Sequence, residues 1–244
     1  MSETALLPTP RLYPLGETAV VLEFGTFISE ATNDTIRAVA DYLMAYPFAG
    51  FTELVPAFTT LTVFYDPWQV GQATTNSAYE FVADQLWQRL RQRPAAGLPD
   101  AAETAAAVEI PVCYGGGFGP DLAAVAAHCG LSPAEVVARH AGAEYRVYFI
   151  GFAPGFPYLG GLPPELATPR RTSPRPLVPA GAVGIAGAQT GIYSLPTPGG
   201  WQLIGRTPAR LFRPEAAEPS WLRAGQRLRF VPITEQQFRH WPTA

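Results

Sequence analysis

Short apolar runs alternate with helically spaced apolar residues over the first ninety-five positions. β-rich runs at 12–13, 19–24, 51–55 and 60–65 predict four strands. Between the second and third runs, Ile36, Val39, Ala40 and Leu43 recur at the spacing of one helix face, which predicts a helix within 29–46. Ser77, three residues before Glu80, forms a capping box and predicts the start of a second helix.

The pattern changes after a stretch of small residues at 96–107, which we interpret as a linker. A strand is expected at 108–113, followed by a short helix with Pro120 at its first position and Gly130 at its end. Ser132 and Glu135 predict a further helix that ends near His140. From residue 145 onward, short apolar runs broken by Pro and Gly are typical of a β-barrel or sandwich.

These patterns predict an α+β protein of two domains. The order strand, helix, strand, strand, helix, with another strand later, is the βαββαβ order of a ferredoxin-like domain, expected at 1–95. The linker at 96–107 then leads to a β-barrel domain with two short helices at 108–244.

The composition narrows the class of protein. With 48% hydrophobic and 15% charged residues, the 244-residue chain is expected to be ordered and compact. No signal peptide is visible, no run approaches eighteen apolar residues, and two cysteines form no disulfide framework, so we expect a cytoplasmic protein that does not enter a membrane. The net charge of −3 and the single arginine in the second of the two short helices argue against nucleic-acid binding.

All 17 basic residues of the chain are arginine. The absence of lysine excludes a Schiff-base lysine, a biotinyl-lysine and the lysine of a Walker A loop within this polypeptide. Chemistry that needs a lysine must therefore lie outside this chain.

Positive charge is concentrated between residues 146 and 213, where seven arginines face one acid, Glu165. Arg170, Arg171 and Arg175 lie in a proline-stiffened loop, which favours the presentation of guanidinium groups to a carboxylate or phosphate. Arg206 follows an expected core strand. Other candidate substrate-binding side chains in this region can form hydrogen bonds or stack: Tyr158, Gln189, Thr190, Tyr193 and Trp201.

Several glycines in this half could bring backbone N–H groups against a ligand, and the candidates are Gly155, Gly187 and Gly191. In a sequence, a glycine that binds a ligand cannot be distinguished from a glycine that only allows a turn with positive φ. The same holds for the glycines at 115–117. Neither these glycines nor the three candidates match a P-loop or a dinucleotide-binding motif. His128 and His140 are expected to be structural. Three scattered histidines without clustered carboxylates predict no metal site, and no catalytic residue can be named.

One long segment resembles a known family. The runs YRVYFIGFAPGFPYLGGL, TPRRTSPR and VPAGAVGIAGAQTGIYSLPTPGGWQLIGRTP closely resemble the B-type subunit of the bacterial ATP-dependent 5-oxoprolinase. This family is also called allophanate hydrolase subunit 1 and includes a histidine-kinase inhibitor of the KipI type. The similarity extends back through PVCYGGGFGPDLAAVAAHCGLSPAEVVARH and covers nearly the whole chain.

The resemblance implies a ferredoxin-like N-terminal domain and a cyclophilin-like β-barrel C-terminal domain. It also implies a hydrolase complex with subunits A and C that opens the lactam 5-oxo-L-proline to L-glutamate at the expense of ATP. This chain alone would be inactive. Because the chain lacks a phosphate-binding lysine motif, we expect a partner to hold most of the ATP. The arginine pair would hold the carboxylate of the substrate or a phosphorylated lactam, and Gln189 and Thr190 would address the ring amide.

The resemblance leaves two alternatives open, since members of the family differ in activity. One is a regulatory protein that binds a sensor histidine kinase, and the other is a carboxylase-associated role in urea or allophanate metabolism. Four positions depart from the expected family pattern: Gly117 replaces an acid, Ala182 a serine, Ala188 a polar residue or glycine, and Cys129 an asparagine. The loss of an acid and a hydroxyl argues against an acid–base pair in this chain.

Overall fold

A computed structural model describes residues 9–74, 77–93 and 106–242. The chain divides into two compact units, Met1–Asp100 and Ala101–Ala244, and we describe each by itself. Most of the expected linker at 96–107 lies outside the described residues, so its bounds stay a prediction. No helix in the described part of the chain is both long and apolar enough to cross a membrane.

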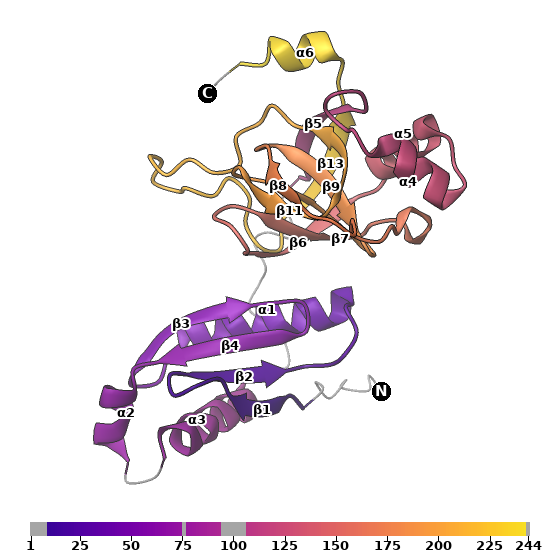
Figure 1. Ribbon diagram of the computed structural model, residues 1–244. Coiled ribbons are helices and arrows are strands. Elements are labelled where there is room, and N and C mark those ends of the chain that lie inside the picture. The colour runs from indigo at the N-terminus through magenta and orange to yellow at the C-terminus, as the bar shows by residue number, and fades with distance from the viewer. Residues whose placement is uncertain (1–8, 75–76, 94–105, 243–244) are drawn as a thin grey trace. The chain divides into compact units, whose positions relative to one another are not determined.

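The N-terminal unit consists of one antiparallel sheet and three helices (Figure 1). The sheet has the order β1-β2-β4-β3. Its buried side chains alternate along β4, where Leu61, Val63 and Tyr65 face the core. The elements in chain order are β1 (Arg11–Pro14), β2 (Ala19–Glu23), α1 (Glu30–Ala45), β3 (Phe51–Pro56), β4 (Thr60–Tyr65), α2 (Pro67–Ala73) and α3 (Ala78–Gln92).

The two long helices form where the pattern predicts them. α1 buries Ile36, Val39 and Leu43, the apolar stripe read from the sequence. α3 begins at the predicted capping box, in which the Ser77 hydroxyl accepts from the backbone N–H of Glu80 and the Glu80 carboxylate accepts from that of Ser77. The sequence reading missed α2, whose N-terminus is capped by the Asp66 carboxylate.

The order of helices and strands along this unit differs from the expected βαββαβ order. No described residue of this unit forms a strand after α3, and the strand expected at 108–113 lies in the C-terminal barrel, within the predicted bounds of that domain. β1 instead pairs with β2 as an antiparallel hairpin and extends the sheet on that side. The coarse description, a sheet with helices, holds, and the ferredoxin-like assignment stays a prediction.

The C-terminal unit is built around a closed barrel with the strand order β10-β7-β6-β13-β5-β12-β9. Only the β13–β5 pair is parallel among the described strands of this unit. This barrel is compatible with the expected cyclophilin-like domain. A separate two-stranded sheet joins β8 and β11. The strands are β5 (Val108–Tyr114), β6 (Tyr145–Ile150), β7 (Pro157–Gly160), β8 (Arg175–Val178), β9 (Ala182–Ala186), β10 (Gln189–Ile192), β11 (Thr197–Gly199), β12 (Gln202–Arg206) and β13 (Arg227–Pro232).

Helical segments accompany the barrel: α4 (Leu122–Cys129), α5 (Pro133–Gly142), a 3₁₀ turn η1 (Pro164–Leu166) and α6 (Glu235–Arg239). α4 ends at Gly130, as predicted, with φ +67°. The expectation for its start was wrong, because Pro120 precedes the N-cap residue Asp121. The Asp121 side chain makes no capping hydrogen bond, since its carboxylate is engaged in the interactions described below.

Candidate functional site

The structure gathers six of the predicted site residues on one part of the C-terminal unit. Tyr158 lies on β7, Tyr193 follows β10, and Trp201 precedes β12. Their rings form one cluster, with centroids 6.2 Å apart for Tyr158 and Trp201 and 6.4 Å apart for Tyr193 and Trp201. We call these three residues, together with Phe152, Phe156, Arg170, Arg171 and Arg175, the arginine–aromatic face.

Phe156 occupies the centre of this cluster. Its ring meets the rings of Tyr193 and Trp201 edge-on, at centroid distances of 5.3 and 5.7 Å, and lies 4.9 Å from that of Tyr158. Such edge-to-face contacts are favourable beyond the area they bury. Because Phe156, Tyr193 and Trp201 are buried, the cluster is a rigid support, and its outer members form the accessible surface.

Phe152 is the exposed member of the cluster. The residue is 63% exposed, and its φ of +67° makes it the one described non-glycine residue with a positive φ. Its ring contacts those of Phe156 and Tyr193 edge-on. A left-handed backbone costs roughly 1–2 kcal/mol for a residue with a side chain. An exposed aromatic ring held at that cost is typical of a binding surface.

A buried carboxylate that sequence reasoning missed fixes the arginine loop. One oxygen of Asp121, Oδ1, accepts hydrogen bonds from Arg175 Nη2 at 2.8 Å and Arg171 Nη1 at 3.2 Å. The other oxygen, Oδ2, accepts from the backbone N–H of Leu203 at 2.7 Å. The Asp121 side chain is 7% exposed, whereas those of Arg171 and Arg175 keep 37% and 22%. Two of the three loop arginines are therefore held in place.

Arg170 is the arginine of the loop that stays available. It is exposed and has no hydrogen bond or ion pair with any described residue. Burial raises the pKa of Tyr158 and of Tyr193, and in both tyrosines the charge of Arg170 opposes that increase. The guanidinium therefore lies close enough to influence both phenol groups. A cation beside exposed and half-buried rings can bind a carboxylate that is attached to a small ring.

Thr190 lies in the barrel core, away from the arginine–aromatic face. It is fully buried, and its hydroxyl donates to the backbone oxygen of Gly184 at 3.0 Å. The Thr190 hydroxyl oxygen is also 3.0 Å from His140 Nε2, and His140 Nδ1 is 2.8 Å from the Tyr114 hydroxyl. Because Thr190 uses its proton on Gly184, His140 donates from Nε2 and accepts from Tyr114 at Nδ1. This chain of hydrogen bonds leaves Thr190 no group for a ligand, which argues against its predicted role.

His140 has a structural role, as the sequence predicts. Burial lowers its pKa to about 3, and its ring stacks on that of Phe230 at a centroid distance of 4.5 Å. The neutral imidazole links α5 to β5 through Tyr114 and to β10 through Thr190.

The candidate glycines also have structural roles. Gly155 has φ +74°, and a Cβ there would lie 2.9 Å from the Cβ of Phe212. The N–H of Gly187 donates to Thr168 O at 2.7 Å, and Gly191 is paired within the barrel sheet with β7 and β9. These contacts argue against a ligand-binding loop made by Gly187 and Gly191. Gln189 begins β10 and is partly exposed.

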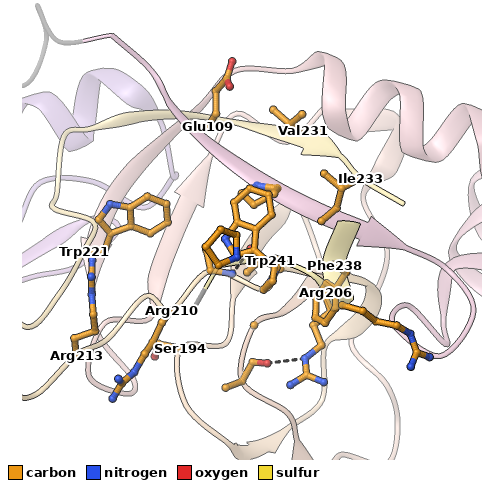
Figure 2. A pocket seen from close by; sticks show the side chains of 18 residues that line it. Glu109, Ser194, Arg206, Arg210, Arg213, Trp221, Val231, Ile233, Phe238 and Trp241 are labelled. Carbon is orange, nitrogen blue, oxygen red and sulfur yellow. Dashed lines mark hydrogen bonds between the residues drawn. The ribbon is translucent and has the colours of Figure 1, made fainter. Parts of the chain in front are cut away.

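Arg206 lies in a separate cavity of about 920 Å³, which we call the C-terminal cavity (Figure 2). Its Nε donates to Ala180 O at 2.8 Å, and its guanidinium carbon lies 5.9 Å from the centre of the Phe238 ring. The other charged and indole-bearing residues that line the cavity are Glu109, Arg210, Arg213, Trp221, Arg239 and Trp241. Arg206 therefore does not join the other predicted arginines.

No described group of three or more His, Cys, Asp or Glu residues could hold a metal ion. Of the four positions that depart from the expected family pattern, Ala182 packs in the core beside Tyr193 and Gly117 lines a second cavity. Cys129 Sγ lies 3.6 Å from Thr168 Oγ1.

Comparison with known proteins identifies the family. Residues 10–222 match the family described as "Carboxyltransferase domain, subdomain C and D". A protein named as the B-type subunit of 5-oxoprolinase, from Bacillus subtilis (strain 168), is 50% identical over 92% of this chain and 93% of its own length. The chain belongs to this 5-oxoprolinase subunit family. A second member of the same name, from Escherichia coli O157:H7, is 47% identical over 92% of this chain and 97% of its own length.

Solved structures are also similar to this chain. The crystal structure of TTHA0988 is 39% identical, with a TM-score of 0.75 over 93% of this chain, although the match spans only 41% of the TTHA0988 chain. The Kluyveromyces lactis urea amidolyase, at 17% identity, has a TM-score of 0.76 over 98% of this chain and 16% of its own length. That likeness concerns the fold alone.

Proposed function

We propose that this chain is a subunit of an ATP-dependent 5-oxoprolinase complex, which opens the lactam 5-oxo-L-proline to L-glutamate. The observation that supports the proposal is the identity of 40–50% with three proteins named as this 5-oxoprolinase subunit, over at least 90% of both chains. The partners would be subunits A and C. ATP would be the co-substrate of the complex, with the greater part of its binding site on a partner.

The arginine–aromatic face is the proposed contribution of this chain to the substrate site. 5-Oxo-L-proline is a flat five-membered ring that bears a carboxylate and an amide. Arg170 would bind the carboxylate, and the rings of Phe152 and Tyr158 would pack against the apolar part of the lactam. Arg171 and Arg175 would keep the loop in place through Asp121. Since this face is open, a partner protein would complete the site and exclude water.

ATP-dependent glutamate release from 5-oxo-L-proline tests the proposal. The assay compares this chain alone, subunits A and C together, and the mixture of all three. We expect release only from the three-part mixture. An assembled mixture without release would refute the proposal and direct attention to histidine-kinase binding or a carboxylase-associated role.

Arg170 is tested in the same mixture. We expect Arg170→Gln to raise the KM for 5-oxo-L-proline at least tenfold with an unchanged melting temperature, because the Arg170 side chain has no hydrogen bond or ion pair with the described residues. The matched control is Arg139→Gln, another exposed arginine, which pairs with Glu165 and so links α5 to η1. An unchanged KM in Arg170→Gln would remove this residue from the site.

A further inference from the structure

The C-terminal cavity has a composition that the proposed function does not use. Four arginines line it (Arg206, Arg210, Arg213 and Arg239), against one carboxylate, Glu109. Two indoles, Trp221 and Trp241, also line it. In the view of Figure 2, Trp221 and Arg213 lie on the left of the cavity, and Arg206 and Phe238 lie on its right. A cavity of about 920 Å³ falls in the size range of sites for drug-sized ligands.

The Arg206 side chain is preorganised to bind an anion. Its Nε is fixed by Ala180 O, and its guanidinium lies over the Phe238 ring, so the side chain has little conformational freedom left to lose. Neither terminal nitrogen has a hydrogen-bond partner among the described residues. A guanidinium fixed at Nε, with both terminal nitrogens free to donate, matches the geometry of phosphate oxygens.

The other three arginines can bind an anion with little loss of existing interactions. The Arg213 side chain has no hydrogen bond or ion pair in the described part of the chain. Arg210 pairs with Glu215 at 2.7 Å, and Arg239 Nε pairs with Glu235 at 2.9 Å. All four of these paired side chains are at least 54% exposed. Exposed pairs contribute little, so a multiply charged anion can replace the glutamates.

A second cavity of about 510 Å³ shares Arg206, Ile233 and Arg239 with the first. The loop Gly115, Gly116 and Gly117 lines it. Gly115 and Gly116 have φ of +70° and +51°, and a Cβ at Gly116 or Gly117 would meet no atom within 4 Å. The N–H groups of Gly116 and Gly117 carry no hydrogen bond among the described residues. Free N–H groups in a glycine turn beside two arginines are suited to phosphate binding.

We propose that the two cavities together bind a nucleoside polyphosphate. The phosphates would lie between Arg206, Arg239 and the glycine loop, in place of the Glu235 carboxylate that lines the second cavity. The ribose and base would lie in the C-terminal cavity against the indoles, where Arg213 lies on the same side as Trp221 and would contact them. A small carboxylate such as a lactam acid would fill only a part of this space and leave most of the cationic groups unused. The identity of the nucleotide as the ATP of the complex rests on the proposed function, with the difference that the greater part of the ATP site would then lie on this chain and not on a partner. The binding itself rests on the cavities.

Calorimetric titration of the full-length chain alone tests the inference. The ligands are ATP, ADP, inorganic triphosphate and adenosine, each at a fixed salt concentration. We expect ATP to bind at least tenfold more tightly than either triphosphate or adenosine, because only ATP uses both the guanidinium groups and the indoles. Triphosphate that binds as tightly as ATP would overturn the inference, and so would the absence of ATP binding at millimolar concentration.

Variants locate the site. We expect Arg213→Gln to weaken ATP binding at least tenfold without lowering the melting temperature, since its side chain makes no hydrogen bond or ion pair within the described residues. Trp241→Ala should weaken ATP binding and leave triphosphate binding unchanged. The matched control is Arg223→Gln, an exposed arginine that pairs with Glu218 and does not line either cavity. Equal ATP affinity in Arg213→Gln, Trp241→Ala and this control would overturn the assignment.

The outcomes for the two proposals are distinct. Suppose that the chain binds ATP, that Arg213→Gln abolishes this binding, and that the three-part mixture releases no glutamate. This outcome supports the nucleotide site and refutes the 5-oxoprolinase function. Suppose instead that three-part mixtures made with Arg213→Gln or with Trp241→Ala release glutamate with an unchanged KM for ATP. This outcome supports the 5-oxoprolinase function and refutes the nucleotide site.

Discussion

Replacement of Asp121 by asparagine should destabilise the C-terminal unit strongly, although the change removes only a charge. The carboxylate is the counter-charge of both Arg171 and Arg175, at 3.2 and 2.8 Å, and is almost fully buried. Loss of one partner of a buried ion pair costs about 3–5 kcal/mol. Because the two arginines keep 37% and 22% of their side chains exposed, water compensates in part, and we expect about 2–4 kcal/mol.

Differential scanning calorimetry of the full chain measures this effect. A loss of about 2–4 kcal/mol corresponds to a decrease of roughly 6–15 °C in the melting temperature of a unit of this size. The matched control is Glu144→Gln. Glu144 also binds two arginines, Arg227 at 2.6 Å and Arg229 at 2.8 Å, but at the surface.

The contrast between the two variants tests the role of burial. Exposed pairs contribute about 0–1 kcal/mol, so Glu144→Gln should lower the melting temperature much less. Equal decreases in both variants would show that burial of the Asp121 carboxylate adds nothing. A negligible decrease in Asp121→Asn would refute the conclusion that Asp121 fixes the arginine loop.

The remaining predictions concern pH and strain. Because the pKa of His140 is about 3 in the folded chain and its ordinary value is 6.5, the unfolded chain takes up the proton first, and stability falls as the pH decreases below 6.5. Between pH 6.5 and 5, the decrease in the free energy of unfolding should approach about 1.4 kcal/mol per pH unit. Denaturant unfolding measures this free energy, and a constant value over this pH range would contradict the buried neutral imidazole. Phe152→Gly should keep or raise the melting temperature, because glycine tolerates φ of +67°, while it weakens the binding of 5-oxo-L-proline in the three-part assay. Unchanged KM in Phe152→Gly would show that the exposed ring has no part in binding.

Local patterns predicted those features that depend on neighbouring residues in the chain. The apolar stripe of α1, the capping boxes of α3 and α5 and the end of α4 at Gly130 all form where the sequence indicates them. Each of these signals acts over three or four residues, so it does not depend on the rest of the fold. The same locality explains why the pattern predicts β5 as a strand. Its sequence reads as a strand, but the choice between two sheets depends on pairing with β13, more than a hundred residues away.

The candidate site shows the same division. Residue types alone singled out Tyr158, Tyr193, Trp201 and the three loop arginines, because aromatic and guanidinium groups have few equivalents in ligand binding. Asp121 and Phe152 were missed. Neither the burial of Asp121 nor the positive φ of Phe152 can be read from the residue type.

The sequence by itself determined the family, the helices with their caps, the absence of lysine chemistry and the residue types at the arginine–aromatic face. Only the tertiary structure decided which of those residues lie together. It placed Thr190 in the core against His140, placed Arg206 in the C-terminal cavity, and joined Arg171 and Arg175 to Asp121 across about fifty positions of the chain. Contacts of this kind form because the barrel brings distant strands together, and charges left buried must find partners there.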